Sequence, residues 1–295
     1  MAAKQLPLPG TIVKKSNILC RARWGVESVY EPRLVALIAA RVHKDDTDFQ
    51  TYVISVKDLM TDTNDGGKAY SIIETTCRAL MSRVIELREQ GSRSFALYNV
   101  FSKCSYDDKT KTITARFDPD LKPHYLGLKA KFTSYNLIEY LLLSSKYSQR
   151  IFEFLKSWGD QAETVIDLSD LHEMLDVPDS LKTNFKDFRR RVLNTAHKDI
   201  TRKTTFSYEW EPLAKGGEPI KRGRAVVAIR FIFAKIRAEE AQVKAKKEKD
   251  NASYNDNVEI SKTAFECHDQ DPTKCKQHQK KAVCDFCKSF FGDAK

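Results

Sequence analysis

The sequence lacks several features that define other functional classes. No stretch approaches the ~18 consecutive apolar residues that a membrane-spanning helix needs, so we expect no membrane partner. Residues 1–16 hold three lysines but no apolar core, which argues against a secretory signal and indicates a cytoplasmic protein. There is no Gly-x4-Gly-Lys-Ser/Thr phosphate loop, and there is no His-x-His pair for a metal-dependent strand-nicking reaction. The protein is therefore not expected to be an enzyme.

Cysteine is scarce over most of the chain and clusters near the C-terminus. In a reducing compartment such a cluster indicates metal binding more than disulfides. Zn²⁺ favours four sulfur or nitrogen ligands in a tetrahedron, and the tail offers two closely spaced pairs, with Cys267 and His268 as substitutes. The candidate ligands are Cys275, His278, Cys284 and Cys287. Structural zinc is the one cofactor that the sequence suggests, and the alternative is a polar tail with free thiols.

The chain is moderately basic and long enough for more than one domain. Lys and Arg number 50 against 40 Asp and Glu in 295 residues, which gives a formal net charge of +10. Because a domain usually holds roughly 100–200 residues, the length predicts two domains, and a hydrophobic content of 41% allows each to bury a core. The excess of positive charge favours an anionic partner without identifying it.

The first region has the element order of a winged-helix unit. Apolar residues at helical spacing predict helices over 30–42 and 72–87, and a run of β-branched residues predicts a strand over 51–56. Alternation of apolar and polar residues over 95–104 and 110–117, around a polar loop, predicts a hairpin. Two helices followed by a hairpin form the basis of this assignment.

A second region repeats this order on a larger scale. The predicted elements are helices over 137–142, 147–158, 169–175 and 181–199, and strands over 165–168, 206–210 and 225–233. Glycines and a proline between the last two strands predict a flexible wing. The fold class is therefore α+β, with an N-terminal extension (1–25), two tandem winged-helix domains (26–132 and 133–235), a charged linker or helix (236–262) and a cysteine-rich tail (263–295).

Segment 182–203 is the most informative part of the chain, with eight basic and two acidic residues. On a wheel at ~100° per residue, Phe185, Phe188, Val192 and Ala196 share an apolar arc, and basic and amide side chains face the other way. One face would dock on the domain while the other enters a DNA major groove, where Arg pairs with guanine, Asn with adenine and Lys with phosphate. The alternative is a solvated basic face. The candidate DNA-binding residues are Lys182, Asn184, Lys186, Arg189, Arg190, Arg191, Asn194, His197, Lys198, Arg202 and Lys203.

A second basic patch lies in the predicted wing. Lys221, Arg222 and Arg224 stand between two predicted strands, where a wing can reach the minor groove or the DNA backbone. The alternative is an ordinary charged loop. This patch therefore supports DNA binding only in combination with the basic helix.

Several segments resemble the iteron-binding plasmid replication initiators. Residues 147–155 (Tyr-Ser-Gln-Arg-Ile-Phe-Glu-Phe-Leu) look like a helix motif of that family, and Phe-Arg-Arg-Arg-Val-Leu at 188–193, with Ala196, Asp199 and Ile200, resembles its recognition helix. Segments 222–226 and 229–233 resemble its final hairpin, and 78–83 is similar to a helix of its first domain. The resemblance covers residues 26–233, and it is closest in the second domain.

This resemblance implies a sequence-specific protein for double-stranded DNA with repeated origin sites. It implies that the second domain reads the repeats, and that the first mediates homodimerisation and phosphate contact. Members of the family open origins as monomers and often repress their own promoter as dimers. An initiator of this kind is also expected to recruit host helicase or replisome components. The long connector 211–222 and the cysteine-rich tail depart from the family pattern.

Two other functions stay open at the level of sequence. A transcription regulator could use the same winged-helix fold without initiating replication, and sequence features do not separate these two DNA-binding functions. A strand-nicking enzyme is the third hypothesis, which the missing histidine pair disfavours.

Overall fold

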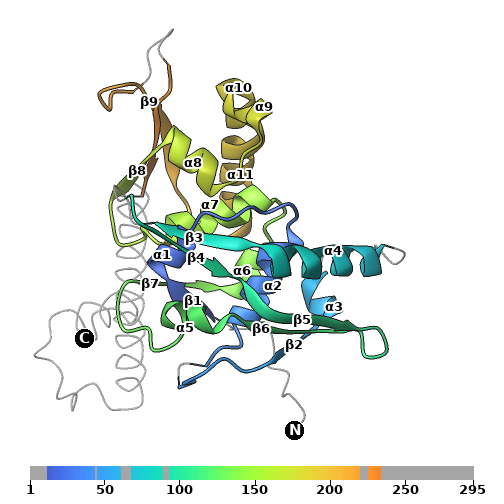
Figure 1. Ribbon diagram of the computed structural model, residues 1–295. Helices are drawn as coiled ribbons and strands as arrows, with labels where there is room; N and C mark the ends of the chain where they lie inside the picture. Colours follow the sequence, from blue (N-terminus) through green and yellow to red (C-terminus); the bar gives the residue numbers. More distant parts are fainter. Residues whose placement is uncertain (1–11, 44, 61–67, 89–92, 220–224, 234–295) are drawn as a thin grey trace, which may run out of the picture. The chain divides into compact units, whose positions relative to one another are not determined.

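The computed structural model describes residues 12–43, 45–60, 68–88, 93–219 and 225–233 (Figure 1). These residues form helices interleaved with four small antiparallel sheets. The segment 236–262, the tail 263–295 with its candidate zinc ligands, and Lys221, Arg222 and Arg224 lie outside the described residues. Within the described ranges, no helix combines the length and the apolar character needed to cross a membrane.

The first region contains most of the expected helices and strands, with two differences. The predicted helix over 72–87 ends at Ser82, because residues 84–88 form a strand that pairs with residues 95–99. Its helices are α2 (Tyr30–Ala39), α3 (Val56–Leu59), α4 (Ala69–Ser82), the 3-10 helix η1 (Pro119–Leu121) and α5 (Lys122–Tyr125). Its strands are β2 (Tyr52–Ser55), β3 (Val84–Arg88), β4 (Phe95–Asn99), β5 (Phe101–Asp107) and β6 (Thr112–Phe117). The predicted hairpin strand 95–104 is two strands, because the chain changes sheets at the fully buried Val100. Thus β4 pairs with β3, while β5 pairs with β6.

The N-terminal segment belongs to the folded core, which differs from the predicted extension over 1–25. Strand β1 (Ile12–Ser16) pairs antiparallel with β7 (Phe132–Asn136), and α1 (Asn17–Cys20) follows it. Trp24 is also buried. The alternation of β1 was hidden in the sequence because Lys15, a charged residue, occupies an inward position and is 4% exposed.

The second region is built on a long basic helix and a three-stranded sheet. Its helices are α6 (Leu137–Leu141), α7 (Lys146–Lys156), α8 (Leu168–Met174), α9 (Asp179–Lys182), α10 (Phe185–Phe188) and α11 (Asn194–Lys203), with a π turn at Arg189–Leu193. Its strands are β8 (Glu163–Asp167), β9 (Glu209–Leu213) and β10 (Ala228–Ile232), in the order β8-β10-β9. Strand β9 begins later than the predicted 206–210, since Phe206 and Tyr208 pack their rings into the core instead.

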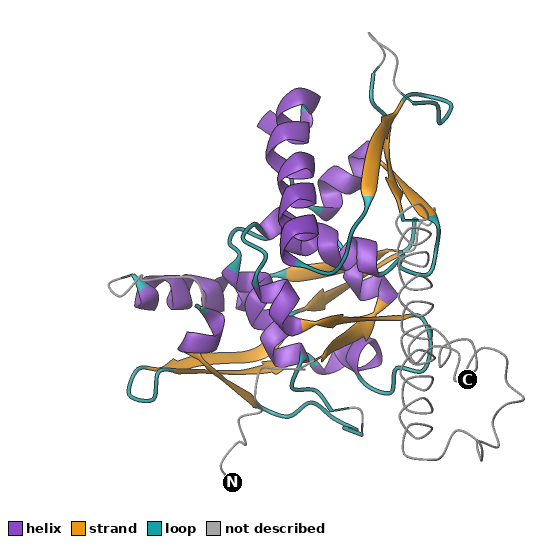
Figure 2. Ribbon diagram, turned by 180° about the vertical axis from the view of Figure 1, so that it is seen from behind, coloured by secondary structure: helices purple, strands orange, loops and turns teal. Residues whose placement is uncertain are grey.

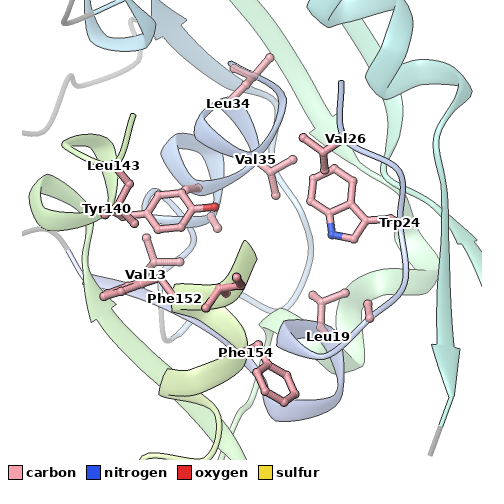
Figure 3. Packing of buried hydrophobic residues seen from close by; sticks show 14 of the residues in the cluster. Val13, Leu19, Trp24, Val26, Leu34, Val35, Tyr140, Leu143, Phe152 and Phe154 are labelled. Atoms are coloured by element: carbon pink, nitrogen blue, oxygen red, sulfur yellow. The ribbon is translucent and has the colours of Figure 1, made fainter. Parts of the chain in front are cut away.

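Helix α7 lies at the centre of one continuous hydrophobic core. Figure 3 shows Phe152 and Phe154 of this helix among side chains of β1, α1, α2 and α6. Helix α11 packs against α7 as well. The core therefore runs through the predicted boundary between residues 132 and 133, and α7 supports both the first region and the basic helix.

A carboxylate without access to water fixes α7. Glu153 forms an ion pair with Lys15 of β1 and accepts hydrogen bonds from Tyr135 Oη of β7 (2.6 Å) and Arg150 Nη1 (3.0 Å). Burial acts to raise the pKa of Glu153, but the charges of Lys15 and Arg150 and the hydrogen bonds from Lys15 and Tyr135 together outweigh burial and hold this pKa below its usual value. The carboxylate stays ionised, and its partners join strands that are far apart in the sequence.

We expect Glu153→Gln to lower the free energy of unfolding by about 3–5 kcal/mol, because it leaves two buried cations without a counter-charge. Urea unfolding followed by circular dichroism measures this loss. The control is Glu74→Gln, since Glu74 forms an exposed pair with Arg78 at 2.9 Å on α4. This change should cost no more than about 0.5 kcal/mol. A Glu153→Gln variant as stable as the control would contradict the assignment.

Candidate nucleic-acid interface

The predicted helix over 181–199 is interrupted at residues 183–184, because α9 ends at Lys182. The basic helix is continuous over residues 185–203 and begins at a side-chain cap. Asn184 Oδ1 accepts a hydrogen bond from the backbone N–H of Asp187 at 3.2 Å. Such a cap satisfies one of the free N–H groups at the start of a helix. Asn184, one of the candidate DNA-binding residues, therefore has a role in holding the helix itself.

The apolar arc predicted for this helix is confirmed. Phe188, Val192 and Ala196 are buried, and Phe185 is half-buried against the core. Asp199 anchors the far end, because its carboxylate accepts from the backbone N–H of Ser144 at 2.8 Å. One face of the helix is thus attached to the α6–α7 side of the molecule, and the other face is free to meet a ligand.

The opposite face is strongly cationic. Lys186, Arg191, Lys198 and Arg202 are exposed and form no ion pair within the described residues. Arg190 is exposed too, but its Nη2 donates to Asp187 Oδ1 at 2.8 Å. Exposed guanidinium and ammonium groups at this density match the phosphate and base chemistry of DNA. Asn194 is exposed on the same helix.

Three further candidate residues form contacts within the protein. His197 is half-buried, and its Nε2 lies 2.9 Å from the carbonyl oxygen of Tyr208. Lys203 pairs with Asp199 at 2.7 Å, and Lys182 pairs with Asp179 at 3.0 Å. The structure therefore gives His197 a packing role, while the two lysines stay on the surface as paired charges.

Arg189 connects the basic helix to the neighbouring strand. Its guanidinium lies 5.8 Å from the ring centroid of Trp210 on β9, within the range of a cation–π contact. In both views the helix and the β9–β10 strands extend side by side (Figures 1 and 2). Arg189 was a candidate residue without a predicted partner, and Trp210 was not among the candidate residues.

The β9–β10 ladder forms the base of a wing. Glu211 of β9 accepts from Arg230 Nη1 of β10 at 2.8 Å, and the chain leaves β9 through Gly216 and Gly217, both at positive φ. Positive φ is easily adopted only by glycine, so these positions turn the chain sharply. The basic residues predicted at the tip, Lys221, Arg222 and Arg224, lie outside the described residues.

Thr195 is a functional candidate that the sequence did not indicate. Its hydroxyl donates to the carbonyl oxygen of Arg190 at 3.1 Å, inside the cationic part of the helix. A helical wheel with a constant angle per residue contains no sign of the π turn that makes this contact, and threonine is common on helix surfaces. No sequence signal would have identified it.

Comparison with known proteins assigns both regions to one family. Residues 12–156 match the family model described as "Initiator Replication protein, WH1", and residues 167–233 match "Initiator Rep protein, WH2". The first model includes β1 and α7.

Individual relatives agree with this assignment. A curated "Replication initiation protein" of Escherichia coli is 28% identical over 159 residues, and the match covers 51% of this chain and 47% of the relative. The chain thus matches about half the length of that protein. A crystal structure of the Pi initiator protein in complex with iteron DNA has a TM-score of 0.55 at 20% identity, over 75% of this chain and 96% of that one. The fold is shared, and the chain belongs to the family of initiator replication proteins with winged-helix domains WH1 and WH2.

Proposed function

We propose that this protein initiates plasmid replication by binding repeated double-stranded DNA sequences at an origin and promoting its opening. The observation that carries the proposal is the exposed cationic face of helix 185–203, which stands beside a strand pair in a winged-helix domain of an initiator family. A helix of this diameter fits the major groove. No catalytic chemistry of its own is needed, because binding energy can deform the DNA.

The exposed side chains divide into two classes of contact. Arg190 and Arg191 have the bidentate donor geometry that suits guanine, and Asn194 can pair with adenine. Lys186, Lys198 and Arg202 supply charges that suit phosphates and set the position of the helix. This division rests on side-chain chemistry and exposure.

A footprint across the flanking DNA of the encoding replicon tests the proposed function, at controlled salt because phosphate contacts are salt-sensitive. Protection of regularly spaced direct repeats supports an initiator, and additional protection of its own promoter supports autorepression. Protection of one promoter operator alone would replace the proposal with a transcription regulator. Nicking of supercoiled DNA would replace it with an enzyme.

Recruitment of host helicase or replisome components is a further part of this proposal, to be tested by pull-down with the purified components.

Homodimerisation through the first region is the second part of the proposal. Strand β4 pairs with β3 on one side only within the described residues, and its side chains Phe95 and Leu97 are 59% and 57% exposed. An unpaired edge with apolar side chains can add a strand from another chain. A second copy of the protein is the occupant that we propose.

Zinc in the tail is the third part. We propose that Cys275, His278, Cys284 and Cys287 hold one structural Zn²⁺, and the support is the ligand type and spacing in the sequence. Metal analysis of the protein purified under reducing conditions should find about one zinc per chain. A Cys284→Ser and Cys287→Ser variant should lose it. A metal content equal in the native and variant proteins would overturn this assignment.

Arg191→Ala should weaken binding to the specific site by about 1–3 kcal/mol if a base contact is lost, with little change on unrelated DNA. Lys198→Ala should instead weaken binding to both DNAs alike and lower the salt slope by about one, as expected of a phosphate contact. Fluorescence titration at several salt concentrations measures both. An Arg191→Ala variant with native affinity and native sequence preference would remove Arg191 from the interface.

Leu97→Glu should shift the protein towards monomer, because a charge on an apolar strand interface is costly to bury. Analytical ultracentrifugation measures the change, and it should be at least about tenfold in the dimer dissociation constant. The matched control is Val165→Glu, on β8 of the second region, where Val165 is 39% exposed. Equal behaviour of the two variants would refute β4 as the dimer edge.

A further inference from the structure

The basic helix is widened at the three consecutive arginines. Arg189–Leu193 forms a π turn between α10 and α11, and the backbone N–H of Asn194 donates to the carbonyl oxygen of Arg189, five residues back. In a regular α-helix this bond would reach only four residues back. π turns are rare and frequently found at functional sites. This one occupies the part of the helix with the highest density of positive charge.

The hydroxyl of Thr195 makes a contact that spans five residues, the same separation as the backbone hydrogen bond of the wide turn. It donates to the carbonyl oxygen of Arg190 at 3.1 Å, a separation of five residues. Serine and threonine in helices normally reach back three or four residues. The other threonine hydroxyls of this region that reach back along a helix do so over four residues: Thr183 to Asp179, Thr201 to His197 and Thr204 to Ile200. The Thr195 bond therefore favours the π turn over a regular turn.

The wide turn changes how the arginines are presented. Successive side chains rotate by less than the ~100° of an α-helix, so three neighbours share a narrower arc. Arg189, Arg190 and Arg191 are all exposed, while Val192 and Leu193, next in the same turn, are buried. Within these five residues, the three arginines therefore form part of the cationic surface, while Val192 and Leu193 pack into the core.

We infer that Thr195 is a positioning residue for DNA reading. Its hydroxyl holds the π turn, and the π turn presents the three arginines together on one surface. This inference rests on the proposed function, since it assumes that the arginines contact DNA. According to this inference, Thr195 affects which DNA sequence the protein prefers, although the residue carries no charge.

The test replaces Thr195 with valine, which keeps the branched shape and removes the hydroxyl. The matched control is Thr201→Val, which removes the hydroxyl that bonds the carbonyl of His197 at 2.6 Å in the regular part of the same helix. Thr195→Val should lose about tenfold in affinity for the specific site, the size of one base contact, with unchanged affinity for unrelated DNA. Thr201→Val, and Thr195→Ser as the rescue variant, should stay within about twofold of the native protein. Equal losses in Thr195→Val and Thr201→Val would overturn the inference.

A double-mutant cycle separates positioning from direct contact by Thr195 with DNA. If Thr195 acts through the arginines, its replacement should have a smaller effect in an Arg190→Ala, Arg191→Ala background than in the native one. Full additivity would overturn the inference, since it would show an independent contact.

Measurements on the free protein distinguish failure of this inference from failure of the proposed function. The amide signals of residues 190–193, away from the substituted position, should shift clearly in Thr195→Val and much less in Thr195→Ser, as seen by NMR. Unchanged signals would overturn the role of Thr195 in holding the turn, whatever the DNA results. If the native protein shows no specific binding, the proposed function fails and the DNA-reading role fails with it, while the amide signals still decide the turn.

Discussion

The buried charge of Glu153 is the constraint on which the rest of the fold depends. An ionised carboxylate away from water is tolerated only when its oxygens are fully paired. Here the pairing groups come from β1, β7 and α7 itself, at Lys15, Tyr135 and Arg150. Arg150 continues the network, since its Nη2 donates to the carbonyl oxygen of Ala22 at 2.6 Å. The network gives α7 one defined position, because a shift of any member would leave a buried charge unpaired.

The position of α7 sets the position of the candidate DNA-binding face. Phe152 of α7 packs edge-on against Phe206, which follows α11, with ring centroids 6.1 Å apart. The loop ahead of α7 supplies Ser144, whose N–H and hydroxyl bind the carboxylate of Asp199 on α11. The helix is therefore fixed to α7 through apolar and polar contacts together. Because the helix is already held in a fixed position, less conformational entropy is lost when it binds its ligand.

The sequence predicted the features that follow a simple period. The apolar arc of Phe188, Val192 and Ala196 is confirmed because burial on a helix repeats at nearly constant spacing. Strand β1 was missed because Lys15 breaks the alternation, and a lysine can be buried there only with Glu153 as its partner, far away in the sequence. The break at Val100 was missed for a similar reason, since it depends on which strands lie nearby. Long-range partners override local pattern in both cases.

The candidate site was predicted in its composition more than in its geometry. Charge density identified segment 182–203, but a uniform wheel placed His197 on the outward arc, whereas its ring contacts Tyr208. The π turn shifts the faces of the helix at its centre, which no count of residue types can show. Trp210 contacts Arg189, and Thr195 contacts Arg190. Both residues could be identified only once the structure had placed these arginines.

The ion pair between Arg190 and Asp187 places a negative charge within the cationic face of the helix. Asp187 keeps a lowered pKa through the hydrogen bond from Arg190, so the carboxylate remains charged at neutral pH. This carboxylate occupies Nη2 of Arg190, so a ligand meets Arg190 through its other N–H groups or displaces the carboxylate, and in both cases the negative charge of Asp187 stays nearby. A phosphate placed there without a compensating contact would meet electrostatic repulsion. At this position Asp187 therefore disfavours ligands that offer negative charge alone.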